Sequence, residues 1–471
     1  MLFTAPSFLF LFLPAVMAIY ALIPRHYRRY AILLFNLAYY VIAVWYTPES
    51  ILLALLTSAF TYSAGFVIAV THRRSTLLAA IAVDLIAFAI YRGAYDYASG
   101  SSYFPLGAAI YLLAAISYLI DIYRNDAPHA KNIADLLIYM LFFPTLIVGP
   151  IIRYKDFGAM LEKIDFSLEN FAEGVKLYIA GFLKHIAIAA VLDYILARTA
   201  EVGEAAYSIP IILLNVLMLC AQAWFALTGY SDMARGLMYM LGIPSAADFQ
   251  LTPLSRTPAD FPRRFFVSLN RWVEDYLVYP ILRVQFLSSR TRRVLAACVI
   301  CLVPAIWVKS RLYILLPILP VLLWRCTHIL RESCRHREPG KLGLAVGRAC
   351  YWLLFLACFV GFWFTVSLDD AKTGADLIRK TLESATLEIP YAMYAVLSHL
   401  GYLIVGVVGL LCFLPLRPEA EQRIQALPRP ISIVIRAAAL AGVMICFAFS
   451  ILHFLPQFPQ YAISAFAHVV F

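Results

Sequence analysis

The feature that most constrains this chain is the recurrence of apolar stretches of about 18–20 residues, the length a helix needs to cross a bilayer. Hydrophobic residues make up 63% of the chain and charged residues only 14%. No water-soluble fold covers that much apolar surface, so lipid must cover part of it. The clearest stretches lie near residues 5–23, 30–46, 50–70, 76–92, 105–122, 208–228, 349–367, 391–414 and 432–454.

Four further apolar regions are interrupted by proline, glycine or charge: residues 134–152, 171–199, 265–285 and 294–330. They fit spans, half-helices or re-entrant segments. We therefore predict an all-α polytopic membrane protein with about eleven transmembrane helices plus re-entrant or broken helices. Residues 1–471 are expected to form a single membrane domain, with N-terminal helices in 1–125, a core in 126–330 and C-terminal helices in 331–471.

The charge of the loops predicts an orientation. The net charge of +10 is typical of a membrane protein with basic cytoplasmic loops, and we do not expect a nucleic-acid partner. Basic loops at 25–29 and 72–74 alternate with loops poor in basic residues, which places the N-terminus outside the cell. The first apolar stretch lacks a basic region before it and is expected to be a span, not a cleaved signal peptide. The nine cysteines lie mostly inside apolar runs, which favours small core residues over disulfide or metal ligands.

The middle of the chain, between residues 117 and 282, carries polar and charged side chains inside or beside apolar segments. Such side chains are costly in a membrane and usually need a reason. The run from Phe142 to Tyr154 places two prolines and a glycine in an apolar stretch, which breaks a helix. A broken helix at membrane depth must be buried in protein or line a water-filled cavity.

Four blocks of this region, in order, carry a family resemblance: Tyr118–Asp121, Phe142–Arg153, Gly229–Asp232 and Arg263–Pro280. They resemble the signature blocks of the membrane-bound O-acyltransferase family, in the bacterial branch of alginate O-acetylation and teichoic acid D-alanyl transfer proteins. The resemblance implies helices around a central cavity. It also implies a cytoplasmic acyl thioester donor, acetyl-CoA or an acyl carrier protein, with no cofactor held permanently. The acceptor hydroxyl would come from the other face or from the membrane.

The resemblance also implies a set of substrate-binding residues: Asp121, Arg153, Tyr230, Asp232, Arg263, Arg264, Asn270, Trp272, Asp275 and Trp307. Structural roles compete with binding for several of them. Asp121 with Arg124, and Asp232 with Arg235, are also spaced to form ion pairs that hold the bundle together. Arg263 and Arg264 suit either a donor phosphate or the general excess of basic residues on the cytoplasmic side.

The chain departs from the family where its catalytic histidine is expected. Val308 takes that place after Trp307, Phe266 takes the place of a second histidine, and a third falls near Val321. Valine cannot accept a proton from an acceptor hydroxyl. The stand-ins are Lys309, whose pKa burial could lower, and His328, seven residues past Val321. The competing interpretation of Lys309 is an interfacial anchor.

Three functions remain open from the sequence. The first is a catalytically degenerate member of the family that binds a donor, a glycan or a partner in cell-envelope or exopolysaccharide O-acylation. The second is an active O-acyltransferase with a non-standard base. The third is a transporter of a lipid-linked intermediate, although no inverted repeat is visible. The expected partners are the bilayer of the inner membrane, an acyl carrier or periplasmic acetylation protein, and a polysaccharide or lipid-linked glycan acceptor.

Overall fold

The computed structural model describes residues 2–45, 47–99, 107–201, 209–250, 264, 266–285, 287–308, 349 and 353. Every element within these residues is a helix, which confirms the all-α prediction for this part of the chain. The stretches predicted at 391–414 and 432–454, and nearly all of 349–367, lie outside the described residues.

The first part of the chain forms helices that follow the predicted apolar stretches. Side chains make no capping hydrogen bond at the starts of α1, α2, α3 and α5. The residue that follows α3, His72, has the left-handed conformation (φ 48°). The elements are η1 (Phe8–Phe12), α1 (Leu13–Leu22), η2 (Arg25–Tyr27), α2 (Arg28–Ala43), α3 (Pro48–Thr71), α4 (Arg74–Ser99) and α5 (Ala108–Arg124).

The second part contains several short helices, the long helix α10 and two π-helical segments that lie between α-helices. Side-chain caps define two helix starts: Asn132 accepts from the N–H of Asp135, and Ser167 from that of Asn170. The elements are α6 (Ile133–Met140), η3 (Phe143–Thr145), α7 (Tyr154–Glu162), α8 (Leu168–Leu183), η4 (Lys184–Ala189), α9 (Ala190–Glu201), α10 (Ile209–Met240), α12 (Val267–Val273), η7 (Glu274–Val278), α13 (Tyr279–Leu282) and α14 (Ser289–Val308).

Three helical runs among the described residues are long and apolar enough to cross a membrane: Pro48–Thr71, Arg74–Tyr91 and Leu168–Ala197. The total of about eleven spans therefore stays a prediction. The third run joins α8, η4 and α9, so the region 171–199 is one continuous helix with a π-helical segment inside it. Region 134–152 is interrupted, as the sequence predicted, whereas α12, η7 and α13 follow one another without a break in region 265–285.

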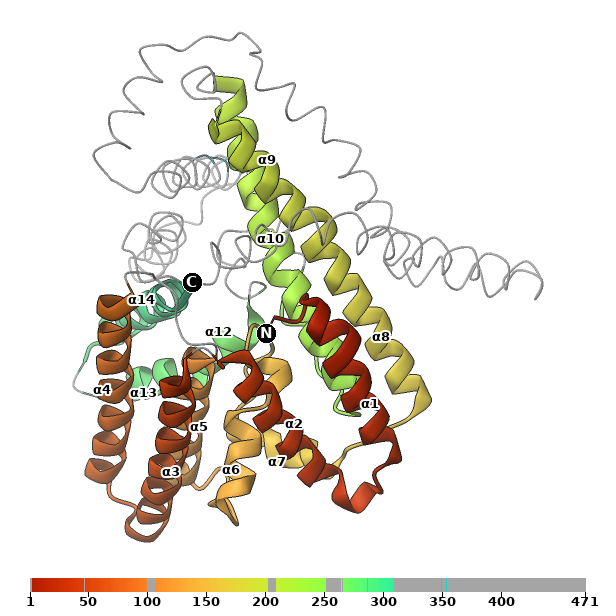
Figure 1. The fold of residues 1–471 in the computed structure, drawn as a ribbon. Coiled ribbons are helices and arrows are strands. Elements are labelled where there is room, and N and C mark those ends of the chain that lie inside the picture. Colours follow the sequence, from red (N-terminus) through yellow and green to blue (C-terminus); the bar gives the residue numbers. More distant parts are fainter. Residues whose placement is uncertain are drawn as a thin grey trace, which may run out of the picture.

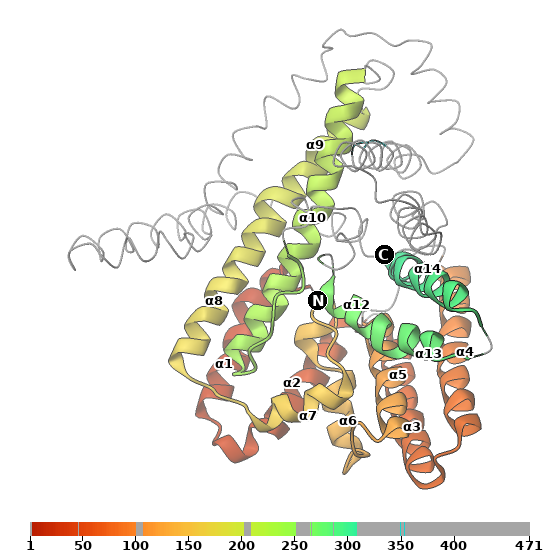
Figure 2. The ribbon, with the colours of Figure 1, turned by 180° about the vertical axis from the view of Figure 1, so that it is seen from behind.

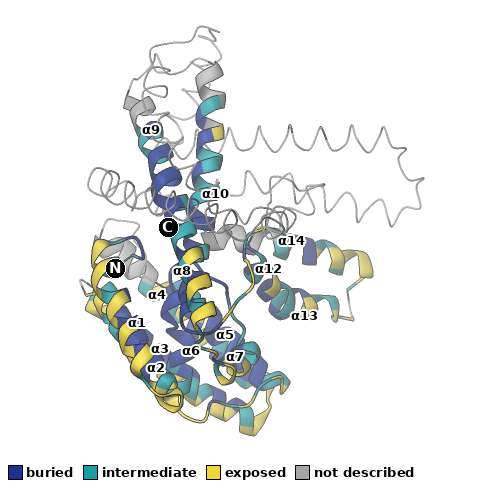
Figure 3. Cartoon of the chain, turned by 90° about the vertical axis from the view of Figure 1, so that its right-hand side faces the viewer, coloured by how far each residue is buried: buried dark blue, intermediate teal, exposed yellow. Residues whose placement is uncertain are grey.

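The helices form two neighbouring groups (Figures 1 and 2). Helices α3, α4 and α5 lie side by side, and the long α8–α9 run packs along α10 and extends beyond the other helices. The outward faces of α1 and α2 are exposed, whereas α9 and α10 are buried where they meet (Figure 3). Large apolar side chains such as Leu22, Leu34 and Val70 lie on the exposed faces, as expected of a surface that lipid covers.

Glycines bring α8 and α10 into backbone contact. Gly181 faces Gly229, and seven residues away on each helix Gly174 faces Gly236. A Cβ at Gly181 would lie 2.4 Å from the carbonyl oxygen of Gly229, and one at Gly174 would lie 2.6 Å from that of Gly236. Small residues at such crossings let membrane helices approach closely. This contact places the polar residues of η4 opposite those of α10.

Candidate functional site

The candidate site is built around the irregular segment of residues 141–153, between α6 and α7. Most of this segment is buried, and it has few helical hydrogen bonds of its own. Buried backbone groups without partners cost free energy, especially at membrane depth. The neighbouring helices supply those partners through a small set of polar side chains.

Asn36, in the middle of α2, holds the start of the segment. Its side-chain amide donates to the carbonyl of Ile138 at 3.2 Å, and its Oδ1 accepts from the N–H of Phe143 at 3.1 Å. Asn36 is fully buried. One amide thus pairs the backbone groups on both sides of the point where α6 ends. Its position in a predicted apolar span was the only signal in the sequence, which left it outside the predicted site.

A carboxylate outside the predicted site, Asp248, holds the other end of the segment through Ser268. The Ser268 hydroxyl accepts from the N–H of Ile151 at 2.8 Å and donates to Asp248 Oδ2 at 3.0 Å. The N–H of Ser268 donates to Asp248 Oδ1 at 2.6 Å. This contact ties together the irregular segment, the start of α12 and the loop after α10.

We expect Ser268→Ala to lower the free energy of unfolding by about 2–3 kcal/mol, because the buried N–H of Ile151 and one oxygen of Asp248 lose their partner. Thermal unfolding of the purified protein in one detergent measures the change. The matched control is Ser63→Ala: Ser63 is exposed and bonds only to the carbonyl of Ala59. A loss no larger than that of the control would contradict the role given to Ser268.

Burial raises the pKa of Asp248 to about 7, and the hydrogen bonds from Ser268 oppose this rise. A carboxyl whose pKa is higher in the folded than in the unfolded protein stabilises the fold at low pH, and this contribution is lost as the pH rises through the folded value. We therefore expect the wild type to lose stability between about pH 4 and pH 7 relative to Asp248→Asn. Melting temperatures of both proteins across this range test the prediction, and parallel curves would contradict it.

Asp121, predicted as a binding residue, lies fully buried at the end of a hydrogen-bonded chain. The N–H of Tyr154 donates to the Ser117 hydroxyl at 3.0 Å, which pairs with the Tyr276 hydroxyl at 2.7 Å. Tyr276 donates to Asp121 Oδ1 at 2.8 Å, and the N–H of Lys155 donates to Asp121 Oδ2 at 2.9 Å. A hydroxyl has one hydrogen, so Ser117 must be the donor to Tyr276.

The predicted Asp121–Arg124 ion pair does not form. Arg124 instead donates to the backbone carbonyl of Asp275 at 3.1 Å, and its guanidinium lies 5.6 Å from the ring centre of Tyr276. Asp121 points into the bundle toward Tyr276, whereas Arg124 lies at the last residue of α5. The spacing of three residues on one helix allowed a pair, but η7 supplies each group with another partner.

Arg153 and Asp275, both predicted to bind substrate, pair with each other. Arg153 also bonds Asp156 at 2.7 Å, and Lys155 lies 3.3 Å from the same carboxylate of Asp275. This cluster joins the end of the irregular segment to the π-helical segment η7. The four motif blocks that the resemblance identified therefore meet in part: those at 118–121, 142–153 and 263–280 share one network.

The fourth block lies across the α8–α10 contact. Asp232 pairs with Lys184 of η4 and, at 3.3 Å, with Arg235, which confirms the predicted Asp232–Arg235 ion pair. Tyr230 is fully buried between the rings of Phe3 and His185, and its hydroxyl lies 3.4 Å from that of Thr4. Lys184 had no part in the predicted site, because the sequence alone does not show which side chains of α8 face α10.

Of the remaining residues predicted to belong to the site, some lie in the part of the chain that the structure describes and others lie outside it. Trp272 donates from its indole to the carbonyl of Leu113 at 3.2 Å, and Asn270 donates to that of Phe266 at 3.1 Å. Arg264 accepts on its backbone carbonyl from the N–H of Gln250. Arg263, Lys309, Val321 and His328 lie outside the described residues, and of Trp307 and Val308 only the helical backbone of α14 is described.

Phe266, at the place of the family's second histidine, is buried against Phe249. Their rings stack with centres 5.3 Å apart and planes at 25°. Phe266 also has the left-handed conformation, with φ 53°, at the start of α12. Left-handed φ values are uncommon for bulky residues, so surrounding contacts must hold this one. This position therefore offers hydrocarbon, not a proton acceptor.

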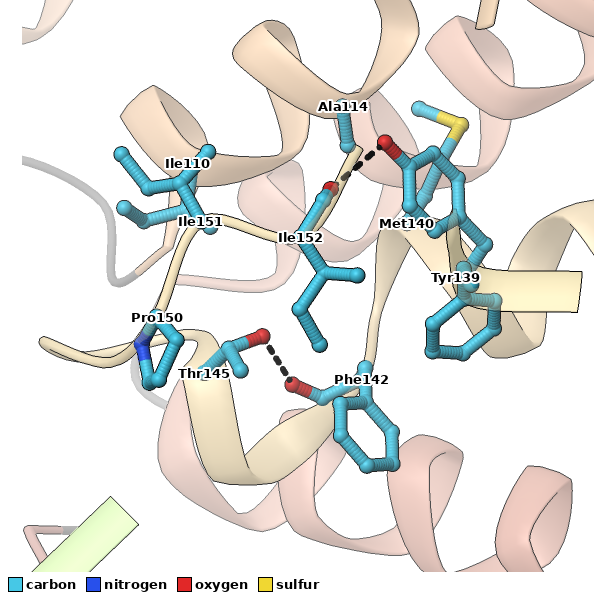
Figure 4. A pocket seen from close by; sticks show the side chains of 10 residues that line it. Ile110, Ala114, Tyr139, Met140, Phe142, Thr145, Pro150, Ile151 and Ile152 are labelled. Carbon is cyan, nitrogen blue, oxygen red and sulfur yellow. Dashed lines mark hydrogen bonds between the residues drawn. The ribbon is translucent and has the colours of Figure 1, made fainter. Parts of the chain in front are cut away.

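A cavity beside the irregular segment is too small for a substrate. Its volume is about 10 Å³, which is room for a single water molecule. Ala114, Met140 and Ile151 are among the residues that line it (Figure 4). The hydroxyl of Tyr139 closes one side by donating to the carbonyl of Ile152 at 3.0 Å, and that of Thr145 donates to the carbonyl of Phe142. The central cavity that the resemblance implies is a different feature and stays a prediction.

Comparison with known proteins adds an independent finding. The sequence profile of the membrane-bound O-acyltransferase family matches residues 42–354. A probable alginate O-acetylase of Pseudomonas fluorescens is 32% identical over 288 residues, which are 59% of this chain and 56% of that protein. The chain thus matches little more than half the length of this relative.

Two relatives with other acceptors in their names are more distant. The peptidoglycan O-acetyltransferase of Helicobacter pylori is 26% identical over 38% of each chain. The teichoic acid D-alanyltransferase of Streptococcus thermophilus is 27% identical over 39% of this chain and 47% of its own.

Proposed function

Because the chain belongs to the membrane-bound O-acyltransferase family, we propose that it works in the O-acylation of a cell-envelope or extracellular polysaccharide. In this proposal it is a catalytically degenerate member, which binds a donor, a glycan or a partner protein without the family's histidine base. The names of its relatives, which act on alginate, peptidoglycan and teichoic acid, support the acceptor class.

The packing of Phe266 is the observation that carries the degenerate assignment. Acyl transfer to a hydroxyl needs a group that accepts the hydroxyl proton, within hydrogen-bond reach. Phe266 stacks on Phe249 where the resemblance expects one histidine, and Val308 replaces another. Because both expected histidines are replaced, we infer that the catalytic activity has been lost and not that one position alone has varied. Asp232 is a poor substitute base, because its two carboxylate oxygens already pair with Lys184 and Arg235.

The polar network around the irregular segment supports a protein that keeps a stable fold without the histidine base. Ser268 and the Arg153–Asp275 pair hold the irregular segment, and Asp121 holds the start of α7, which follows it. In the proposal, acetyl-CoA or an acyl carrier protein is the donor, and the acceptor is a polysaccharide or a lipid-linked glycan with a periplasmic acetylation partner. The protein lies in the inner membrane with its N-terminus outside, as the loop charges indicate.

The proposal is tested with the purified protein in nanodiscs, given a thioester with a labelled acyl group. We expect wild type to release no label above the protein-free rate, whereas Val308→His is the variant expected to gain turnover if the rest of the site is intact. Val308→Leu is the matched control for any change of side chain there. Fast release of label by the wild type would contradict the degenerate assignment, and loss of that release in Lys309→Ala would then identify Lys309 as the base.

A further inference from the structure

Two cations converge on one carboxylate near the middle of a membrane span. Lys184 is the first residue of η4, inside the run Leu168–Ala197, and pairs with Asp232 of α10. Arg235 bonds the other oxygen of that carboxylate at 3.3 Å. The backbone contact between Gly181 and Gly229, one turn away, fixes the two helices at this level.

The charges of this cluster do not balance. A structural ion pair needs one cation for each carboxylate, yet Lys184 and Arg235 share Asp232. One positive charge is left over, and an uncompensated charge within a span is costly unless water or a ligand reaches it.

The cluster is open to a ligand. The side chains of Lys184, Asp232 and Arg235 keep 23%, 18% and 13% of their surface exposed. Arg235 makes only long bonds, of 3.4 Å, to the carbonyl of Ser245. The hydroxyl of Ser245 is buried and has no hydrogen-bond partner among the described residues. A buried polar group without a partner calls for an explanation such as a water or a ligand.

The backbone conformation at Lys184 is also unusual. Segment η4 is π-helical and interrupts an otherwise α-helical run of thirty residues. Such segments are rare and are often found at functional sites. The wider helical turn begins at Lys184, the residue that faces Asp232.

From these observations we infer that Lys184, Arg235 and Ser245 form a binding site for a singly charged oxyanion, a phosphodiester or a carboxylate. One negative charge balances the excess of the cluster, and lysine and arginine side chains are the usual ligands of such groups. The inference adds a ligand class to the proposed function and rests on it only for the source of the anion. A phosphodiester would come from an acyl carrier or a lipid-linked glycan, and a carboxylate from an acidic polysaccharide.

The site is tested by binding, without acyl transfer. The protein is purified in an uncharged detergent that contains no phosphate, and the nuclear magnetic resonance line widths of three probes are titrated. Dimethyl phosphate represents the phosphodiester, methyl glucuronoside the carboxylate, and methyl glucoside is the neutral comparison. We expect the wild type to broaden the lines of at least one anion and not those of the neutral sugar. The anion that binds more tightly identifies the source.

Charge variants separate a binding site from a structural cluster. Lys184→Met should weaken anion binding at least about tenfold, whereas Lys176→Met, at an exposed lysine of α8 paired with Glu173, should leave it unchanged. Asp232→Asn removes the competing carboxylate, so it should tighten binding although it breaks an ion pair. A purely structural cluster would not show this opposite response.

Several results would overturn the inference. The first is that the wild type binds neither anion. The second is that Lys184→Met binds the anion as tightly as the wild type, and the third is that Asp232→Asn binds it more weakly than the wild type. If Lys184→Met does not fold, Asp232→Asn decides the question. A protein that binds the anion but turns over no thioester keeps this inference and the degenerate assignment. A protein that turns over thioester without anion binding overturns both.

Discussion

Asp121→Ala is expected to lower the free energy of unfolding by about 3–5 kcal/mol, because it leaves one buried and one partly buried donor without an acceptor. These donors are the hydroxyl of Tyr276 and the N–H of Lys155, which bond the two carboxylate oxygens at 2.8 and 2.9 Å. Asp121 is fully buried, so water cannot replace the lost oxygens without a rearrangement. The loss should show as a lower melting temperature in detergent.

The matched control for this variant is Asp126→Ala, five residues further along the chain. Asp126 keeps 40% of its side chain exposed and lies 3.9 Å from the ammonium group of Lys155. Exposed pairs of this kind contribute about 0–1 kcal/mol. Tyr276→Phe should give an intermediate loss of stability. It removes the hydroxyl that bonds one oxygen of Asp121, whereas the other oxygen keeps its bond from the N–H of Lys155. Equal melting temperatures for Asp121→Ala and Asp126→Ala would show that the hydrogen bonds of Asp121 do not stabilise the fold.

Gly181→Ala is the second change with a large expected effect, a destabilisation of about 3 kcal/mol. The new methyl group would lie 2.4 Å from the carbonyl oxygen of Gly229 and 2.6 Å from the backbone nitrogen of Met233. Both are backbone atoms, so α8 and α10 must move apart. That movement would also separate Lys184 from Asp232, which lie across the same contact.

The control for Gly181→Ala is Gly158→Ala, which is expected to raise the stability of the protein instead of lowering it. Gly158 lies within α7, and a Cβ there would meet no atom within 4 Å. Gly158→Ala should therefore stabilise the protein by about 0.5–1 kcal/mol, since alanine favours a helix more than glycine does. Melting temperatures of both variants in the same detergent make the comparison. Equal and small shifts in the same direction would mean that α8 and α10 are not in backbone contact.

Long-range hydrogen bonds explain which parts of the site the sequence could predict. The prolines and glycine of residues 142–154 predicted the broken helix, because the helix-breaking property belongs to those residues alone. The partners of that segment come from Asn36, Ser268 and Asp248, which are far away in the sequence. No periodicity or spacing reports such contacts. The sequence therefore predicted where the chain is irregular, but not what stabilises it.

Ion pairs show the same limit. The spacing of three residues predicted the Asp232–Arg235 pair correctly and the Asp121–Arg124 pair wrongly. Both pairs are allowed by helix geometry. The outcome depends on the third group that packs nearby: Tyr276 takes the carboxylate of Asp121, whereas Lys184 joins the pair at Asp232. Such competition is decided by the tertiary structure.

The most direct test of the central claim follows donor binding and donor cleavage in one sample. Wild-type protein in nanodiscs is mixed with acetyl-CoA labelled in its acetyl group, and bound label and free thiol are measured together over time. A scaffold that keeps the donor site but has Val308 in place of the histidine should bind label and release no thiol above the protein-free rate. Release of one or more equivalents of thiol by the wild type would contradict this account and establish a working acyltransferase.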